Sequence, residues 1–157
     1  MSDLTIREER YDGPAATALI AEVQAEYVVR YGGPDEAKVD PDEFAPPRGM
    51  FLVGYLDDAP VATGGWRLLD NGPKGEVVAE LKRMFVVAAH RRRGLSRVML
   101  RALEDTARTA GVRRMILITG IKQPEAMELY RTSEYDVIEG FGHYAGYPDA
   151  RFFGKVL

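Results

Sequence analysis

The segment from Glu80 to Leu100 reads ELKRMFVVAAHRRRGLSRVML and joins an apolar half to a strongly basic turn. Its first half belongs to Glu76–Val87, whose apolar residues predict a long buried strand. Its second half opens Arg93–Ala110, a predicted helix that Gly111 ends. The apolar side of this helix is expected to consist of Val98, Leu100, Leu103 and Ala107. A buried strand therefore runs through a basic turn into a helix.

The start of this helix has the features of a diphosphate site. A helix N-terminus presents unpaired N–H groups and the positive end of the helix dipole, which together attract anions. Gly94 lets the backbone approach a phosphate closely, and Ser96 is small for the same reason. Because cations normally avoid this end of a helix, the local arginines form either a solvated basic face or the site of a bound polyanion. These arginines are Arg91, Arg92, Arg93 and Arg97.

Two spacing motifs narrow the choice of ligand. Neither G-x-x-x-x-G-K-[ST] nor G-x-G-x-x-G occurs, so a P-loop and a dinucleotide fingerprint are both absent. The spacing [RQ]-x-x-G-x-[GAS] is present from Arg91 to Ser96. A second motif, QPEAMELY, spans Gln123 to Tyr130 and is followed by Tyr135.

Together these motifs resemble those of the GNAT superfamily of N-acetyltransferases, and the order and length of the elements agree over residues 4–157. The second family motif is usually N-x-x-A-x-x-L-Y-x-x-x-G-[FY]. Gln123 stands where asparagine is usual, at a position that contacts the pantetheine arm of the cofactor. Glu134 stands where glycine is usual, so we expect the left-handed cap of the preceding helix to be made differently.

The remaining elements give a β-α-loop-β-β-β-α-β-α-β-β order within one domain, residues 1–157. Upstream we expect Leu4–Arg7 (strand), Gly13–Tyr31 (helix), Asp35–Pro47 (loop with one helical turn), Met50–Tyr55 (strand) and Pro60–Leu69 (strand, broken at Gly64-Gly65). Turns are expected at Asp57-Asp58 and Asn71–Gly75. Downstream we expect Arg114–Thr119 (strand), Pro124–Thr132 (helix), Tyr135–Ile138 (strand) and Arg151–Val156 (strand). This order predicts an α/β fold with helices on both faces of a mixed sheet. The resemblance implies the GNAT fold, a mostly antiparallel sheet of six to seven strands with splayed central strands.

The resemblance implies acetyl-CoA as the acyl donor, and no metal. The implied cofactor contacts are Phe85, Val86, Val87, Arg91, Arg92, Arg93, Gly94, Leu95, Ser96, Arg97, Gln123, Glu125, Ala126 and Tyr130. The backbone of Phe85–Val87 is expected to pair with the pantetheine amides. A bulge near Met84–Val86 would expose an N–H group to the thioester carbonyl.

In this family the amine attacks the thioester directly, and the absence of cysteine agrees with a reaction that has no cysteinyl intermediate. Tyr130 is the candidate general acid, because a phenol with a pKa near ~10 stays protonated at neutral pH. Its helical spacing alone favours a half-buried core tyrosine. Glu80 is the candidate base, acting through water, but it shares a strand face with Lys82 and could form an ion pair with it instead. Ordered water and backbone carbonyls are a further alternative.

The expected acceptor is a primary amine of a small molecule, either amino-acid-like or polyamine-like. The family fold walls its pocket with the first helix, the central strands and the last hairpin. These elements supply Glu26, Tyr27, Tyr31, Trp66, Arg67, Phe141, His143, Tyr144 and Tyr147. The rings and Glu26 suit a protonated amine, and Arg67 suits a carboxylate. The alternatives are core or hairpin packing for the rings and a surface position for His143.

Charge and composition restrict the other kinds of partner that the protein could bind. Residues 1–60 hold 13 acidic and 5 basic residues, whereas residues 61–157 hold 11 acidic and 16 basic ones. This division favours a cationic partner for the first part and an anionic one for the second, or two solvated faces. The basic patch is short and lacks interleaved aromatic residues, so no nucleic-acid partner is expected. Without a signal-like or membrane-spanning apolar run, we expect a cytoplasmic protein without a membrane partner.

Two alternatives to a small-amine acetyltransferase stay open. One is a non-catalytic regulatory domain that keeps the coenzyme A site. The other is an acyltransferase that uses another acyl-CoA or acts on a protein or peptide amine. The resemblance also implies a homodimer, since many relatives pair through their last strands.

Overall fold

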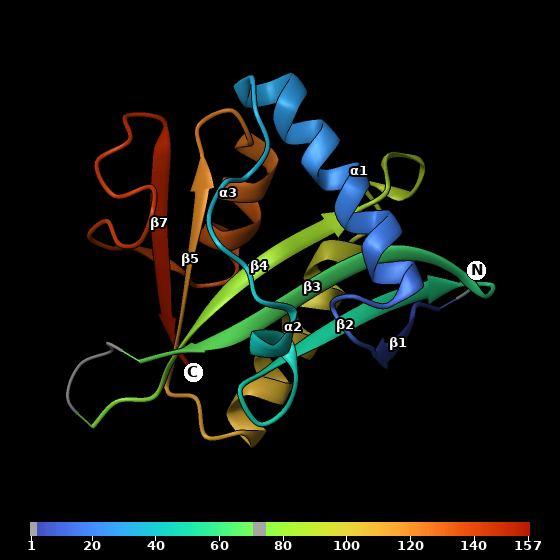
Figure 1. Ribbon diagram of the computed structural model, residues 1–157, viewed down its shortest axis with the longest axis horizontal. Helices are drawn as coiled ribbons and strands as arrows, with labels where there is room; N and C mark the ends of the chain where they lie inside the picture. Colours follow the sequence, from blue (N-terminus) through green and yellow to red (C-terminus); the bar gives the residue numbers. More distant parts are fainter. Residues whose placement is uncertain (1–2, 71–74) are drawn as a thin grey trace.

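The computed structural model describes residues 3–70 and 75–157 and confirms the predicted order of elements (Figure 1). The strands are β1 (Thr5–Glu8), β2 (Gly49–Leu56), β3 (Ala59–Leu69), β4 (Val78–Val86), β5 (Arg114–Gly120), β6 (Asp136–Val137) and β7 (Ala150–Val156). The helices are α1 (Pro14–Tyr31), α2 (Leu95–Thr109) and α3 (Pro124–Thr132), with short 3-10 helices η1 (Pro41–Phe44) and η2 (Ala88–His90). The turn at Asp57-Asp58 is confirmed, whereas the predicted turn at Asn71–Gly75 lies, except for Gly75, outside the described residues.

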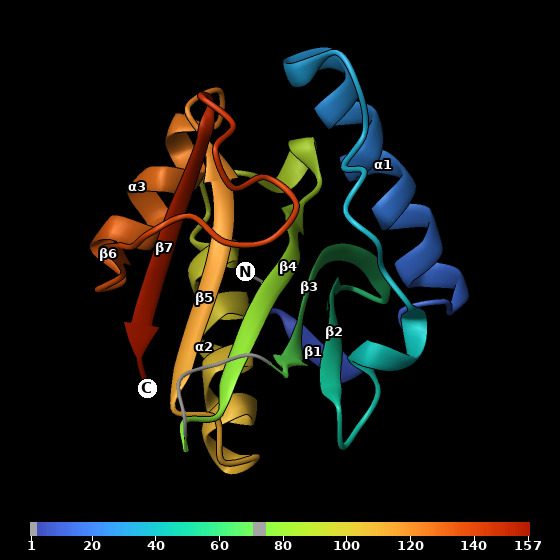
Figure 2. The same cartoon turned by 60° about the vertical axis from the view of Figure 1, so that its left-hand side comes forward.

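The described strands form one mixed sheet in the order β1-β2-β3-β4-β5-β7-β6. Neighbouring strands are antiparallel except for β4 and β5, which are parallel. Helices cover both faces, with α1 on one and α2 on the other (Figures 1 and 2). One buried cluster joins Leu103 of α2 to Tyr130 of α3, and a second joins Leu19 and Val23 of α1 to Phe51. The predicted α/β architecture with splayed central strands and helices on both faces is confirmed.

The parallel strands β4 and β5 pair over only part of their length. Val78–Leu81 of β4 pairs with Arg114–Leu117 of β5. Beyond these residues both strands continue, to Val86 and Gly120, while they move apart, as Figure 2 shows. The edge of β4 that faces β5 is therefore open along its second half.

A β-bulge lies in this second half of β4. Thr63 pairs with Phe85, but Gly65 pairs with Lys82, so β4 has one more residue than β3 in this interval. Arg83 has a φ of +60°, in the left-handed region. The bulge therefore lies just before the expected Met84–Val86 and overlaps it at Met84.

Two details of the packing of α2 on the sheet differ from the sequence-based expectations. The expected break at Gly64-Gly65 is wrong, because β3 is continuous. A Cβ on Gly64 would lie 2.5 Å from Leu103 Cδ1, so glycine at this position lets α2 approach the strand closely. Val98 was expected on the buried side of α2 and is 44% exposed, whereas Met99 is fully buried.

The helix α3 ends in a left-handed cap formed by Glu134 itself, with a φ of +73°. The Tyr135 N–H donates to the Tyr130 carbonyl at 3.0 Å, and the Glu134 N–H donates to the Arg131 carbonyl at 3.3 Å. These two bonds form a Schellman motif. The expectation of a different cap is therefore wrong, because Glu134 takes the conformation that glycine usually provides.

Glu134→Gly is expected to raise the free energy of unfolding by about 0.5–1 kcal/mol. Glycine removes the clash between Cβ and backbone in the left-handed conformation, and this gain exceeds the extra entropy of glycine in the unfolded chain. Urea unfolding followed by circular dichroism checks the prediction. Glu134→Ala is the control, since it removes the charge but keeps Cβ. Equal stabilities of the two variants would contradict the presence of strain at this residue.

Candidate active site

A cavity of about 540 Å³ opens where α1, the loop after it, the diverging ends of β4 and β5, and the β6–β7 loop meet. Its lining includes Tyr27, Tyr31, Lys82, Thr119, Tyr144 and Tyr147. The structure thus brings together four of the residues predicted for the acceptor, Tyr27, Tyr31, Tyr144 and Tyr147. The volume lies within the range of small-molecule sites.

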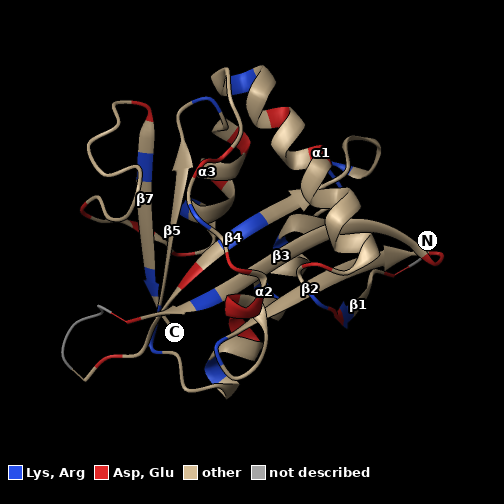
Figure 3. Cartoon of the chain, viewed as in Figure 1, with Lys and Arg blue, Asp and Glu red and all other residues tan. Residues whose placement is uncertain are grey.

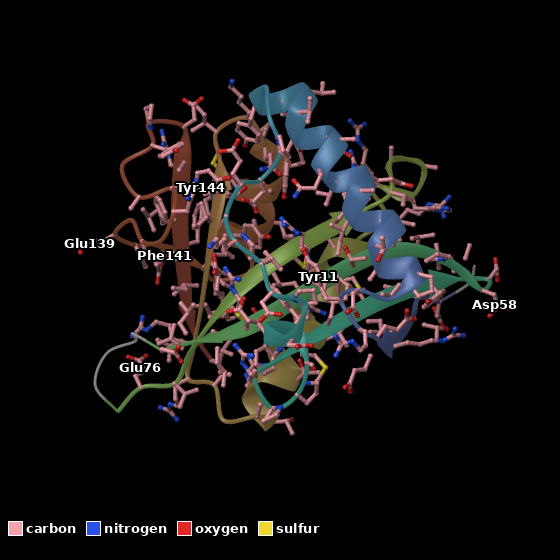
Figure 4. All side chains as sticks on the ribbon, in the orientation of Figure 1. Tyr11, Asp58, Glu76, Glu139, Phe141 and Tyr144 are labelled. Carbon is pink, nitrogen blue, oxygen red and sulfur yellow. The ribbon has the colours of Figure 1, made fainter. Side chains whose placement is uncertain are left out.

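An ion cluster at this cavity joins the loop after α1 to β4. Asp35 Oδ2 accepts hydrogen bonds from Lys82 Nζ at 2.9 Å and from Arg83 Nη1 at 2.8 Å. Asp35 Oδ1 accepts one from the Tyr144 hydroxyl at 2.8 Å, and Arg83 Nε donates to the Tyr11 hydroxyl at 3.0 Å. Figure 3 shows acidic residues on this loop beside the basic part of β4, and Figure 4 labels Tyr11 and Tyr144 at the two ends of the cluster.

The bulge in β4 explains how two adjacent residues reach one carboxylate. Successive side chains on a regular strand point to opposite faces. The left-handed φ of Arg83 interrupts this alternation, so that Lys82 and Arg83 both contact Asp35. Burial alone would raise the pKa of Asp35, but Lys82, a backbone N–H and Arg83 together hold that pKa well below its usual range. The ionised cluster therefore carries one net positive charge.

Glu80, the candidate base, is buried and bonded to Arg67. Its Oε1 accepts hydrogen bonds from Arg67 Nε at 3.2 Å and from Arg67 Nη2 at 3.0 Å. Arg67 also binds Glu43 Oε1 at 3.1 Å and the Lys38 carbonyl at 2.9 Å. The alternative of an ion pair between Glu80 and Lys82 is therefore wrong, because Lys82 belongs to the ion cluster. The guanidinium of Arg67 is committed to partners within the chain.

Tyr130, the candidate acid, lies on α3 with its ring against Tyr135 and Phe153, at centroid distances of 5.6 and 6.2 Å. Among the described residues the Tyr130 hydroxyl has no hydrogen-bond partner. Its oxygen atom is not completely buried, so solvent can reach it. Burial, with a further contribution from Tyr27, raises the pKa of Tyr130 well above its ordinary value. Tyr130 is thus a protonated donor whose hydrogen-bonding capacity is unused.

Tyr27 is a second phenol of the same kind. It lines the cavity, and its hydroxyl also lacks a hydrogen-bond partner within the described part of the chain. Burial raises the pKa of Tyr27 to about 12. Tyr27 lines the cavity, whereas Tyr130 is not among the residues that line it.

The start of α2 is open to an anion. Gly94, its N-cap residue, has a φ of +77°, no side chain caps the helix, and its first turn contains no acidic residue. A Cβ on Gly94 would have no described atom within 4 Å, so the space beside it is free. Arg92 and Arg93 are exposed, and the Ser96 hydroxyl has no partner among the described residues. These features fit the diphosphate of coenzyme A.

The other two arginines of the basic turn point back into the protein. Arg91 Nη2 pairs with Glu26 of α1, the residue expected to bind a protonated amine. Arg97 donates to Thr132 Oγ1 at 2.9 Å and to Ser133 Oγ at 3.1 Å. These two arginines therefore tie the turn and α2 to the neighbouring helices α1 and α3.

The backbone after β4 is less open than expected. The Val87 N–H donates to the Val61 carbonyl at 2.9 Å, and the Val87 carbonyl accepts from the His90 N–H at 3.0 Å. The Val86 carbonyl accepts from Arg91 Nε at 2.8 Å. Val87 is one of the predicted pantetheine contacts, but its backbone N–H and its carbonyl are both already hydrogen-bonded within the chain.

The second motif is held by the end of α1. Gln123 Nε2 donates to the Tyr31 hydroxyl at 3.1 Å. Arg30 pairs with Glu125 at 2.8 Å and donates to the Lys122 carbonyl at 2.6 Å. The side chains of Gln123 and Glu125 are therefore engaged by α1, while Ala126 and Leu95 pack against the core.

Several aromatic residues expected at the acceptor have packing roles. Trp66 is 1% exposed, and its Nε1 donates to Thr106 Oγ1 on α2 at 2.9 Å. Its expected place in the acceptor pocket is therefore wrong. Phe141 packs on Phe152 at 5.5 Å, and His143 is an exposed residue that packs on Tyr144.

Sequence reasoning missed Asp35, Lys82 and Arg83 as parts of the site. Two adjacent basic residues inside an apolar strand segment were the available signal, because cations in a buried strand need acidic partners. Asp35, directly after Gly-Gly-Pro, carried no comparable signal. Its role depends on where the loop crosses β4.

Splayed central strands, an open basic helix start and a cavity beside the diverging strands are typical of one class of enzyme, the acyltransferases that take their acyl group from an acyl-CoA. The model of the acetyltransferase (GNAT) family matches residues 17–135 of the chain. The chain belongs to this family, and it is an acyltransferase that acts on an amine.

Similar proteins agree with this assignment. An IAA acetyltransferase of Azospirillum brasilense is 31% identical over 157 residues, covering 100% of both chains. The crystal structure of a candidate acyl-CoA N-acyltransferase from Klebsiella pneumoniae is 26% identical, with a TM-score of 0.79 and coverage of 98% and 97% of the two chains. The PaiA N-acetyltransferase of Thermoplasma acidophilum, in complex with coenzyme A, shares the fold at a TM-score of 0.73, 11% identity and 99% coverage of each chain. None of the helices formed by the described residues has the length and hydropathy that a membrane span requires.

Proposed function

We propose that the chain transfers the acetyl group of acetyl-CoA directly to a primary amine of a small molecule, with both substrates bound at once. The observation that carries this proposal is the cavity of about 540 Å³ beside the diverging β4 and β5. Its size suits a small acceptor, and its position lets an amine approach the open edge of β4. The full-length similarity to an IAA acetyltransferase supports an acetyl donor.

Acetyl-CoA, when bound, would supply the thioester. The first-turn N–H groups of α2, at Leu95 and Ser96, would hold its diphosphate, and the exposed Arg92 and Arg93 would neutralise its charge. The open edge of β4 at Phe85 would pair with the pantetheine amides as an added strand does.

Tyr130 would donate its phenolic proton to the departing sulfur. Its hydroxyl has no competing partner among the described residues, so the transfer breaks no existing hydrogen bond. Tyr27, which lines the cavity, would orient the amine.

The amine must also lose a proton, and two routes are open. Glu80 would act only through water, since its carboxylate already accepts two hydrogen bonds from Arg67. In the second route, ordered water and backbone carbonyls in the cavity would accept the proton of the amine without Glu80. The geometry favours the second route.

We expect Glu80→Gln to lower the free energy of unfolding by about 1–3 kcal/mol and to change kcat little. Glutamine weakens the bond to Arg67 but removes no catalytic group in this account. Urea unfolding and steady-state rates across the pH range measure the two effects separately. Glu43→Gln is the matched control, because it weakens the ion pair between Arg67 and Glu43, its other acidic partner. A kcat lowered about 100-fold or more, with the acidic limb of the pH profile lost, would make Glu80 the base.

Release of free thiol from acetyl-CoA, measured over a panel of small amines, amino acids and peptides, tests the proposed function. Turnover with a small amine supports it. Thermal stabilisation by coenzyme A without turnover on the whole panel would indicate a regulatory domain. Faster turnover with another acyl-CoA, or with peptides, would correct the donor or the acceptor.

A further inference from the structure

We propose that the acceptor is a monoamine that carries an aromatic ring, and not a polyamine. This inference rests on the proposed function and argues against the polyamine-like class, one of the two acceptor classes that the sequence left open. It depends on the charges and the ring faces that line the cavity.

The charges of the cavity leave little capacity for a polycation. Asp35 is neutralised by Lys82 and Arg83, and Lys122 lies 3.8 Å from Asp149. Among the described lining residues, Glu36 alone offers a carboxylate that no cation pairs with. A polyamine keeps one or more ammonium groups after its reacting amine is deprotonated, and these would meet the positive ion cluster. An acceptor with a single amine avoids this repulsion.

Two of the four tyrosines that line the cavity, Tyr31 and Tyr144, present their ring faces more than their hydroxyl groups. The Tyr31 hydroxyl is occupied by Gln123, and the Tyr144 hydroxyl is occupied by Asp35 and the Glu36 N–H. With their polar ends bound to the protein, these side chains offer mainly apolar surface to a ligand. Such surface favours a flat, uncharged body next to the amine.

Rings line the cavity from two sides. Tyr27 and Tyr31 belong to α1, with ring centroids 6.3 Å apart. Tyr144 and Tyr147 belong to the β6–β7 loop, with centroids 5.1 Å apart and planes at 89°. Tyr147 is 52% exposed although it lines the cavity, so one of its faces is available.

The amine and the ring would occupy different ends of the cavity. The amine must reach the region where β4 and β5 separate, on the side of the cavity that Tyr27 lines. The ring would then lie outward, between the tyrosines of α1 and those of the β6–β7 loop. Tyr147 is the residue that should distinguish a ring from an aliphatic chain.

Initial rates of thiol release from acetyl-CoA with three amines test the proposal. They are 2-phenylethylamine, hexylamine as an aliphatic monoamine of similar length, and spermidine. We expect kcat/KM to be at least about 10-fold higher for 2-phenylethylamine than for either of the others. A preference for spermidine or hexylamine would overturn the inference and leave the proposed function standing. No turnover with any amine, despite binding of coenzyme A, would overturn the proposed function itself.

Tyr147→Ala should lower the ratio of kcat/KM for 2-phenylethylamine to that for hexylamine by about 10-fold. Tyr147→Phe is the matched control, since it keeps the ring and should keep the ratio. Thermal unfolding with and without coenzyme A checks that both variants are folded and bind the donor. If Tyr147→Ala lowered kcat/KM equally for both amines, Tyr147 would shape the loop and would not contact a ring.

Discussion

Replacing Tyr130 with phenylalanine is expected to lower kcat about 100- to 10,000-fold while the affinity for coenzyme A is retained. The departing thiolate loses its proton donor, and the ring that packs against Tyr135 and Phe153 remains. Because the hydroxyl has no partner among the described residues, its removal leaves no buried group unpaired. Steady-state thiol release and calorimetric titration with coenzyme A measure the two quantities.

Tyr135→Phe is the matched control for this experiment. The Tyr135 hydroxyl donates to the buried carboxylate of Glu104 at 2.8 Å. Its loss should cost about 1–3 kcal/mol of stability and leave the kcat of the folded enzyme nearly unchanged. The two neighbouring tyrosines thus have opposite expected effects, one on rate and one on stability. An unchanged kcat in Tyr130→Phe would remove Tyr130 from the mechanism.

Ser96→Asp is expected to weaken the binding of coenzyme A on the order of 100-fold while it stabilises the protein slightly. An acidic residue in the first turn of a helix interacts favourably with the helix dipole. Next to the exposed Arg92 and Arg93 it also gains attraction. The same carboxylate repels the diphosphate that we place there, so stability and affinity should change in opposite directions.

Ser96→Asn separates charge from size in this test. Asparagine has nearly the shape of aspartate without its charge, so the affinity for coenzyme A should fall far less. Calorimetric titration and thermal unfolding of the three proteins give the comparison. Equal affinities of the Asp and Asn variants would mean that the diphosphate binds elsewhere.

The fold was predictable because its signals are local. Gly13–Tyr31 and Arg93–Ala110 have apolar residues at helical spacing and glycine near their ends, and both form helices at nearly those bounds. The errors occurred where a residue had two acceptable conformations or faces. Val98 and Met99 are adjacent and both apolar, so periodicity did not separate them.

The site was predictable only in part, because ion pairs depend on contacts between distant segments. Asp35 and Lys82 are 47 residues apart in the chain, and no local pattern relates them. Likewise, Arg67 looked available for a substrate until the structure showed that Glu80 and Glu43 bind it. The uncapped helix start was easier to predict, since Gly94 and the helix that it opens are neighbours in sequence.

The helix α1 takes part in both halves of the site. Its Tyr27 and Tyr31 line the cavity, whereas its Glu26 and Arg30 hold Arg91 and the start of α3. Any displacement of this one helix would alter the proposed donor and acceptor sites at the same time. Linkage then requires reciprocity: if the bound donor changes the affinity for the amine by some factor, the amine changes the affinity for the donor by that same factor.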